Sequence, residues 1–389
     1  MYELYLKEVQ PKLRGFAERI PQMGGQGYEE VLANAIGGAN LDPEDVAVLL
    51  SCAPNEEKRQ ELVKAATGIK ERYYGNTLKK IIPLSISNYC VNDCAYCGYR
   101  KGSKIIRKRL PIEEFKKEFD FVFNKGYRHI ELVISEDPLL KPELLSEYVE
   151  YAVQRIGESG TGGITFNIAP LDTEGYRKLK DAGLYGLYMW QESYDPHVYR
   201  EFHPSGTPKG DFVNRLTAYE RMIEAGIRSY GVGVLFGLGD PFFEVLNIIE
   251  HCNFLEREYG YMPSMFGIPR LQRAIDSSIN VPPYPVSDGL LKTIVAIYRL
   301  SFPATNIFVN SRETFTFQLE LAEGGGDVIV FECSTYPGGY SKPVTCRQFE
   351  HYYVSAQRIP ILESRGYSIV DSYDNNWEPV LRDLLGVKV

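Results

Sequence analysis

Three cysteines stand close together in the stretch SNYCVNDCAYCGYR, which covers residues 87–100. Cys90, Cys94 and Cys97 follow the pattern CxxxCxxC, and the other four of the seven cysteines are scattered along the chain. A disulfide with one spare thiol is a poor explanation in a reducing compartment, and a structural zinc site needs four ligands, usually in two separated pairs. The spacing favours a 4Fe-4S cluster held by three thiolates, which leaves one iron open for a substrate or cofactor. A buried group of thiols is the alternative.

The overall composition excludes several other classes of protein. Apolar residues make up 44% of the chain and charged residues 24%, which is ordinary for a globular protein. The net charge of −8 gives no basic face for nucleic acid. No apolar run is long enough to cross a membrane, and the N-terminal stretch is charged throughout, unlike a signal peptide. We therefore expect a cytoplasmic protein that binds neither nucleic acid nor membrane.

The cysteines follow the first of several short runs rich in β-branched and aromatic residues, which alternate with amphipathic stretches. The candidate strands are 81–87, 129–135, 163–169, 185–190, 230–236, 264–269, 306–310 and 327–333. Strands that alternate with helices in this way predict parallel pairing through right-handed crossovers. We predict an α/β fold, a (β/α)₈ TIM-type barrel, with a doubly wound open sheet as the alternative. In such barrels the active site lies at the C-terminal ends of the strands, where the cysteines are found.

Outside the barrel the pattern changes. Opposite charges recur at helical spacing in the first 75 residues, and Asp42 stands where a helix would be capped. We predict an N-terminal helical cap over 1–75, the barrel over 76–345, and a helical or extended C-terminal segment over 346–389 that packs on the barrel.

The cysteine motif, with Tyr96 before its last cysteine, resembles that of the radical S-adenosylmethionine (SAM) superfamily. Further motifs resemble its aromatic amino-acid lyase group: NIAPL, WQESYDPHVY, FHPSG, GVLFGL, PRLQRA, SRET and PGGY. The resemblance implies that the open iron binds SAM and that one electron from the cluster yields a 5′-deoxyadenosyl radical. It also implies cleavage of the Cα–Cβ bond of an aromatic amino acid. L-Tyrosine, which would give p-cresol and 2-iminoacetate (dehydroglycine), is the leading substrate, and L-tryptophan or another amino acid is the alternative.

The resemblance implies roles for particular residues in binding the cofactor. Tyr96 belongs to the cluster loop, and Glu136 stands where the superfamily approaches the amino group of SAM. Gln191 and Glu192 end the fourth strand, where polar groups can bond to ribose hydroxyls. Asn167, on the third strand, is a further candidate. We expect the small residues of GVGVLFGLG to let the adenine approach the fifth strand.

Two residues near the end of the barrel are expected to bind the substrate. Arg312, in SRET, offers a planar guanidinium that matches a carboxylate with two parallel hydrogen bonds. Ser334 can add a hydroxyl donor. Ser85 departs from the group, which usually has a tyrosine at this position, so the pocket is expected to be larger or wetter there.

A different class of protein also remains open, an iron–sulfur scaffold or electron carrier. Such a protein rarely needs a whole barrel together with an open iron and a site for a carboxylate, so an enzyme is favoured. The resemblance further implies a low-potential electron donor such as flavodoxin or ferredoxin. The basic run at 99–110 is a hypothetical docking site for it.

Overall fold

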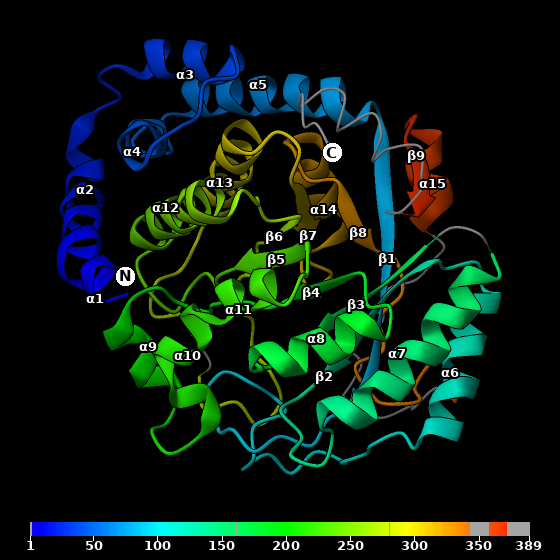
Figure 1. Cartoon of the computed structure of the whole chain (residues 1–389). Helices are drawn as coiled ribbons and strands as arrows, with labels where there is room; N and C mark the ends of the chain where they lie inside the picture. Colours follow the sequence, from blue (N-terminus) through cyan, green and yellow to red (C-terminus); the bar gives the residue numbers. More distant parts are fainter. Residues whose placement is uncertain (1, 160–161, 280, 343–357, 372–389) are drawn as a thin grey trace.

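The computed structural model describes residues 2–159, 162–279, 281–342 and 358–371 (Figure 1). Eight parallel strands form its centre: β1 Thr77–Ser87, β2 His129–Ile134, β3 Gly163–Asn167, β4 Gly186–Tyr188, β5 Ser229–Gly233, β6 Met265–Gly267, β7 Asn306–Val309 and β8 Val328–Val330. Each strand pairs with the next, and β1 pairs with both β2 and β8, so the sheet closes on itself. The predicted TIM-type barrel is confirmed, and the open sheet is excluded.

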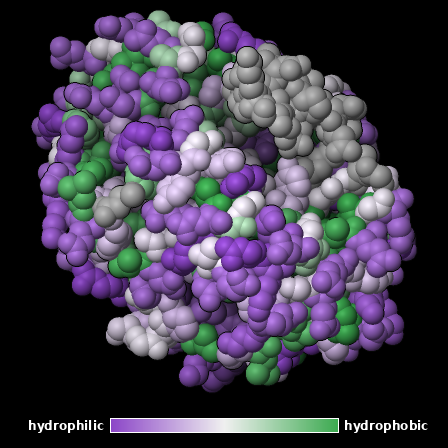
Figure 2. Space-filling view, viewed as in Figure 1, coloured by the Kyte–Doolittle hydropathy of each residue, from purple (hydrophilic) through white to green (hydrophobic). Residues whose placement is uncertain are grey.

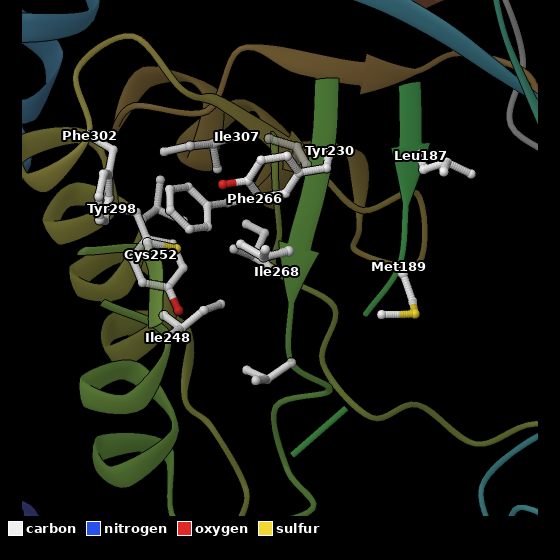
Figure 3. Packing of buried hydrophobic residues seen from close by; sticks show 14 of the residues in the cluster. Leu187, Met189, Tyr230, Ile248, Cys252, Phe266, Ile268, Tyr298, Phe302 and Ile307 are labelled. Carbon is white, nitrogen blue, oxygen red and sulfur yellow. The ribbon is translucent and has the colours of Figure 1, made fainter. Parts of the chain in front are cut away.

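Helices surround the barrel. They are α6 Ile112–Asn124, α7 Pro142–Gly157, α8 Thr173–Asp181, α9 Pro196–Phe202, α10 Phe212–Leu216, α11 Ala218–Glu224, α12 Pro241–Tyr259, α13 Asp288–Ser301 and α14 Phe315–Glu323, with a short 3₁₀ turn at Pro208–Gly210. Alternate residues of each strand point outward to these helices, as the pleat requires. Figure 3 shows part of this packing, in which Phe266 of β6 stacks on Tyr298 of α13 with ring centroids 4.7 Å apart.

The N-terminal residues are helical. The elements are α1 Tyr2–Leu4, a π-helical turn Tyr5–Val9, α2 Gln10–Met23, α3 Tyr28–Ile36, α4 Pro43–Leu50 and α5 Glu56–Tyr74. Asp42 caps α4, and the Asp45 carboxylate accepts a bond from the Asp42 backbone in return. In Figure 1 these helices lie along one side of the barrel, against α12 and α13.

The first helical turns also reach α12 and the loop after β4. The Tyr5 hydroxyl donates to the Asn247 side chain at 2.6 Å, and the Gln10 amide donates to the Tyr194 carbonyl at 2.5 Å. Arg14 of α2 pairs with Asp195 at 2.8 Å. The N-terminal segment is thus fastened to the stretch that carries WQESYD.

A ninth strand was not predicted. α15 Arg358–Ser364 leads into β9 Ser368–Asp371, which pairs in parallel with β1 at Thr77–Lys80. β1 offers this edge because β2 pairs with it only from Ile82 onward. The predicted C-terminal segment includes these two elements, whereas 346–357 and 372–389 lie outside the described residues. The division into cap, barrel and C-terminal segment stays a prediction.

Buried charges close the N-terminal end of the barrel. The guanidinium of Arg299 is fully buried and donates to the Asp327 carboxylate at 2.6 Å and to the Gly325 carbonyl. Lys79 reaches the same carboxylate at 3.1 Å. Lys70 of α5, also buried, donates to the Ala322 carbonyl at 2.6 Å.

The surface visible in Figure 2 is mostly hydrophilic, with apolar residues in small separate patches. Among the described residues, no helix combines the length and the apolar character that crossing a bilayer requires.

Candidate active site

The cysteine loop follows β1 at the C-terminal end of the barrel. It contains little regular structure, so its backbone polar groups need partners from side chains. Arg107 supplies several of them, because its guanidinium donates to the carbonyls of Tyr99 at 2.8 Å and of Arg100 at 2.6 Å. Asn88 ties the start of the loop to the backbone of Ile106 and Lys108. Part of the basic run is therefore used to hold the cysteine loop.

The three thiols of the loop lie near one another. Burial raises the pKa of Cys94 to about 12, with smaller contributions of the same sign from Cys97 and Cys90. A buried thiol with a raised pKa becomes a thiolate ligand only when a cation such as iron displaces its proton. No group of three or more His, Cys, Asp or Glu side chains in the described part of the chain is placed to hold a single ion. In a cluster each thiolate binds a separate iron, so these residues fit a cluster better than one metal ion.

Cys97 lines a cavity of about 230 Å³ at the C-terminal ends of the strands. The segments that follow β4, β5, β6, β7 and β8 also contribute to its wall. The lining residues include Tyr96, Glu192, Arg312, Trp190 and Asn310. The cavity thus brings together four residues singled out from the sequence: Tyr96, Cys97, Glu192 and Arg312.

Tyr96 is held by a histidine from the FHPSG motif. Its hydroxyl lies 2.8 Å from Nε2 of His203, and the other ring nitrogen of His203 lies 2.7 Å from the Tyr199 carbonyl. A carbonyl can only accept, so Nδ1 carries the proton and the tyrosine hydroxyl donates to Nε2. Burial lowers the pKa of His203 to about 3, which keeps the ring neutral. His203 thus links Tyr96 of the cysteine loop to the backbone of α9 by hydrogen bonds.

Glu192 occupies a strained and strongly charged position. Its φ of 70° lies in the left-handed region, which is costly for a residue other than glycine and is common at functional sites. The carboxylate lies 2.6 Å from Nζ of Lys209 and 3.6 Å from the guanidinium of Arg215. Burial alone would raise the pKa of Glu192, but these two cations outweigh it and the pKa is lowered. The group therefore stays ionised in the wall of the cavity.

Lys209 and Arg215 were not predicted from the sequence. They lie in and after the 3₁₀ turn that follows α9, in a stretch without a recognisable motif. Only the fold places them beside Glu192, so the sequence carries no local signal that could have found them.

Glu136 braces the cysteine loop beside this cavity. Its carboxylate accepts a bond from the Asn92 amide at 2.7 Å, and its carbonyl accepts from the backbone of Val91. The Asn92 side chain in turn accepts from the backbone of Lys209 at 2.9 Å. One asparagine therefore connects the cysteine loop, the loop after β2 and the cation beside Glu192.

The structure places the other predicted residues differently. Gln191 is fully buried away from the cavity, where its amide nitrogen lies 3.4 Å from the Ser193 carbonyl. Asn167 points into the barrel and donates to Glu131 at 3.2 Å. Ser334 lies just before the cavity-lining Thr335, and its hydroxyl lies 3.4 Å from the Tyr336 carbonyl. The roles predicted for these three residues stay predictions.

One glycine on β5 and one on β6 make room for a tryptophan. A Cβ added to Gly233 would lie 2.8 Å from the Trp190 ring, and one added to Gly267 would lie 2.7 Å from it. Trp190 also stacks on Tyr188, with the ring planes 11° apart. It therefore both packs in the barrel interior and lines the cavity. Within GVGVLFGLG it is Gly233 that lies against the indole. The expectation that the small residues of this stretch let the adenine approach the fifth strand stays a prediction.

Comparison with known proteins identifies the family. A model of the radical SAM superfamily matches residues 84–252. A crystal structure of HydG, a maturase of the FeFe-hydrogenase, has a TM-score of 0.84 at 32% identity and covers 94% of this chain and 80% of HydG. The chain belongs to the radical SAM superfamily, in its aromatic amino-acid lyase group.

Other members of the group agree with this assignment. HydG of Carboxydothermus hydrogenoformans has a TM-score of 0.82 at 33% identity and covers 93% of this chain and 84% of that one. The 2-iminoacetate synthase of Salmonella typhimurium is 29% identical over 310 residues, which are 79% of this chain and 80% of the synthase. As a radical SAM enzyme, the protein uses an iron–sulfur cluster, SAM and a reductant to act on a small molecule.

Proposed function

We propose that this radical SAM enzyme is a carbon–carbon lyase that cleaves the Cα–Cβ bond of an aromatic amino acid. L-Tyrosine is the leading substrate, and p-cresol and 2-iminoacetate are the products. The observation that carries the proposal is the shared cavity, in which Cys97 of the cluster loop and Arg312 both take part in the wall. The product named for the Salmonella typhimurium relative, 2-iminoacetate, supports the same reaction.

In this proposal, Cys90, Cys94 and Cys97 hold a 4Fe-4S cluster. When bound, the cluster and SAM supply the one-electron chemistry that generates a 5′-deoxyadenosyl radical. Glu192 accepts from the ribose hydroxyls of SAM, because Lys209 and Arg215 keep it ionised and fixed.

Four further residues were predicted to bind the cofactor, and the fold places two of them closer to the cysteine loop and its cavity than the other two. Glu136 lies beside the cysteine loop, where its carboxylate could accept from the amino group of SAM. Tyr96 contributes its ring to the wall of the cavity. Asn167 faces the barrel interior, whereas Gln191 would have to turn from its buried position to reach the ribose.

Arg312 binds the carboxylate of the substrate in this proposal, and Ser334 adds a hydroxyl donor. A charge-assisted pair of this kind contributes about 1.5–3 kcal/mol in a partly buried site. The electron comes from a low-potential donor such as flavodoxin or ferredoxin in the cytoplasm. Lys101 and Lys104 remain exposed near the cysteine loop and could receive it.

An anaerobic reaction tests the proposal. The enzyme is reconstituted with iron and sulfide, mixed with SAM, dithionite and either L-tyrosine or L-tryptophan, and its products are separated by chromatography. 5′-Deoxyadenosine with p-cresol is the expected result. 5′-Deoxyadenosine with an indole product would mean that L-tryptophan, and not L-tyrosine, is the substrate. The absence of any amino-acid-dependent cleavage would overturn the proposal that the enzyme is a lyase.

A pair of cysteine variants tests the cluster separately. Cys94→Ala should lose most of the bound iron and the electron paramagnetic resonance signal of the reduced cluster. Cys252→Ala removes another buried thiol, from α12 and outside the cysteine loop, and should keep both. Equal iron contents in the two variants would refute the assignment of the cluster to this loop.

A further inference from the structure

The closed barrel does not bury all of its inward-facing side chains completely. On β2, Ile130, Leu132 and Ile134 pack outward in the main core, so the residues between them face the barrel axis. The same alternation turns interior residues of neighbouring strands inward. Several of them are only partly buried although the barrel surrounds them: Pro83, Val133, Asn167, Trp190 and Phe308. A close-packed barrel interior would bury these side chains fully, so their residual exposure indicates space between the strands, which we call the chamber.

Glu131 faces this chamber with an incomplete set of partners. It is 7% exposed, and its one hydrogen bond is the 3.2 Å contact from the Asn167 amide to Oε1. In the described part of the chain Oε2 has no protein donor and the carboxyl has no cationic partner. Burial raises the pKa of Glu131 to about 7, and the bond from Asn167 offsets only part of that rise. A buried carboxyl that serves only the fold is normally paired on both oxygens, because an unpaired one is costly.

Arg312 and Glu131 lie at different depths of the barrel, Arg312 at its mouth and Glu131 further inside. Burial raises the pKa of the Cys333 thiol, in the interior cluster of side chains, to about 12. Two charges make smaller contributions, since Arg312 lowers this pKa and Glu131 raises it. The thiol is therefore close to both groups. Arg312 lines the outer cavity, whereas Glu131 stands beside Pro83 on β1, one inward-facing position deeper than Ser85. An amino acid held by its carboxylate at Arg312 would extend its side chain toward Glu131.

We propose that the Glu131 carboxyl accepts a hydrogen bond from the far end of the substrate side chain and so selects amino acids that carry a donor there. Asn167 orients the carboxyl by holding its other oxygen. The inference rests on the proposed function, since it assumes that an amino acid enters the cavity. A phenol hydroxyl supplies such a donor without charge, and a side-chain ammonium supplies it with charge. The small Ser85 side chain leaves the path to Glu131 open.

Binding of matched amino-acid pairs tests the selection. The reconstituted enzyme with SAM is titrated anaerobically by calorimetry with L-tyrosine and L-phenylalanine, and then with L-lysine and L-norleucine. Each pair differs chiefly in the donor at the tip. A hydrogen bond to a buried charged acceptor should favour the donor of one pair by at least about 10-fold.

Two variants assign that preference to Glu131. Glu131→Met fills a similar volume without an acceptor, and should bring the preferred pair to nearly equal affinities. Glu131→Gln keeps an acceptor of the same shape, and should retain part of the preference. Glu250→Gln, the same change on the outer helix α12, should leave both affinities unchanged. Thermal unfolding of each variant shows whether the fold is kept. Replacing a buried acid that has no cationic partner with methionine should change the stability little, since the loss of the acceptor for Asn167 offsets the relief of the buried acid.

The outcomes separate this inference from the proposed function. p-Cresol formation without any preference within either pair would overturn the role of Glu131 and leave the lyase intact. A preference for lysine over norleucine that Glu131→Met removes would support the role of Glu131 and discard tyrosine as substrate. A preference that survives in Glu131→Met would also overturn the inference, even if the variant folds normally.

Discussion

Arg312 has a geometry that lysine cannot reproduce. Its planar guanidinium presents two parallel donors to a carboxylate, whereas an ammonium is a single point of charge on a flexible stem. If Arg312 binds the substrate carboxylate, charge alone is not sufficient for binding.

Arg312→Lys should therefore weaken amino-acid binding by about 10-fold or more, since it removes one charge-assisted hydrogen bond. Affinity for SAM should change little. Calorimetry with each ligand checks both expectations, with Arg257→Lys on the exposed face of α12 as the control. An unchanged amino-acid affinity would mean that the carboxylate is bound elsewhere.

Lys209 is predicted to act through Glu192. Lys209→Met removes the cation 2.6 Å from the carboxylate, so the pKa of Glu192 should rise and SAM should bind more weakly. Breaking a buried ion pair lowers the free energy of unfolding by ~3–5 kcal/mol. The loss here should lie near the lower end of that range, because Arg215 still faces the carboxylate. Lys209→Arg keeps the charge and should restore most of both quantities. Chemical denaturation and SAM titration provide the measurements, and an unchanged SAM affinity would contradict the role given to Glu192.

At the scale of elements, the strands β4, β5 and β6 are arranged around one indole. The ring of Trp190 lies where glycines on the two neighbouring strands leave space. Gly267→Ala should lower the stability by about 1–3 kcal/mol, because its Cβ would meet two atoms of the Trp190 ring at 2.7 Å. Gly68 lies in the middle of α5, where an added Cβ would meet no atom within 4 Å apart from the backbone of its own helix. Gly68→Ala should therefore raise the stability by about 0.5–1 kcal/mol. Urea unfolding of the two variants compares them directly, and shifts of the same sign would show that Trp190 can move aside.

The elements were also the features best predicted from the sequence. All eight barrel strands were expected, because alternation of short apolar runs with amphipathic helices is a repeated local pattern. β9 was missed because it is short and depends on a free edge of the distant β1. The cysteines were found by their spacing and Arg312 by its motif. Glu131 was not found, because its lack of a partner is a property of the closed barrel.

At the scale of the whole molecule, burial of charge makes the stability depend on pH. Lys70 lies in the group that closes the N-terminal end of the barrel, and burial lowers its pKa to about 8. Between that value and 10.5 the unfolded chain holds a proton on Lys70 that the folded chain has lost. The unfolded state thus binds more protons, and the contribution of Lys70 to the free energy of unfolding rises with pH across this window.

The comparison of the protein with Lys70→Met isolates this contribution. The variant has no proton to lose, so its stability relative to the parent should be highest below pH 8 and should decline as the pH approaches 10.5. Denaturant unfolding at several pH values measures the difference. A constant difference across the window would show that Lys70 keeps its charge in the folded protein.

The attachment of the N-terminal helices has a practical consequence. Tyr2 packs against Phe212 of α10, with ring centroids 6.4 Å apart, and α10 carries the Arg215 that faces Glu192 (Figure 1). A purification tag joined ahead of Tyr2 would therefore begin beside α10, the helix whose Arg215 helps to hold Glu192 in the wall of the cavity. A bulky fusion partner there would press on α10, so a preparation with a long spacer or a removable tag is the one suited to measuring SAM affinity.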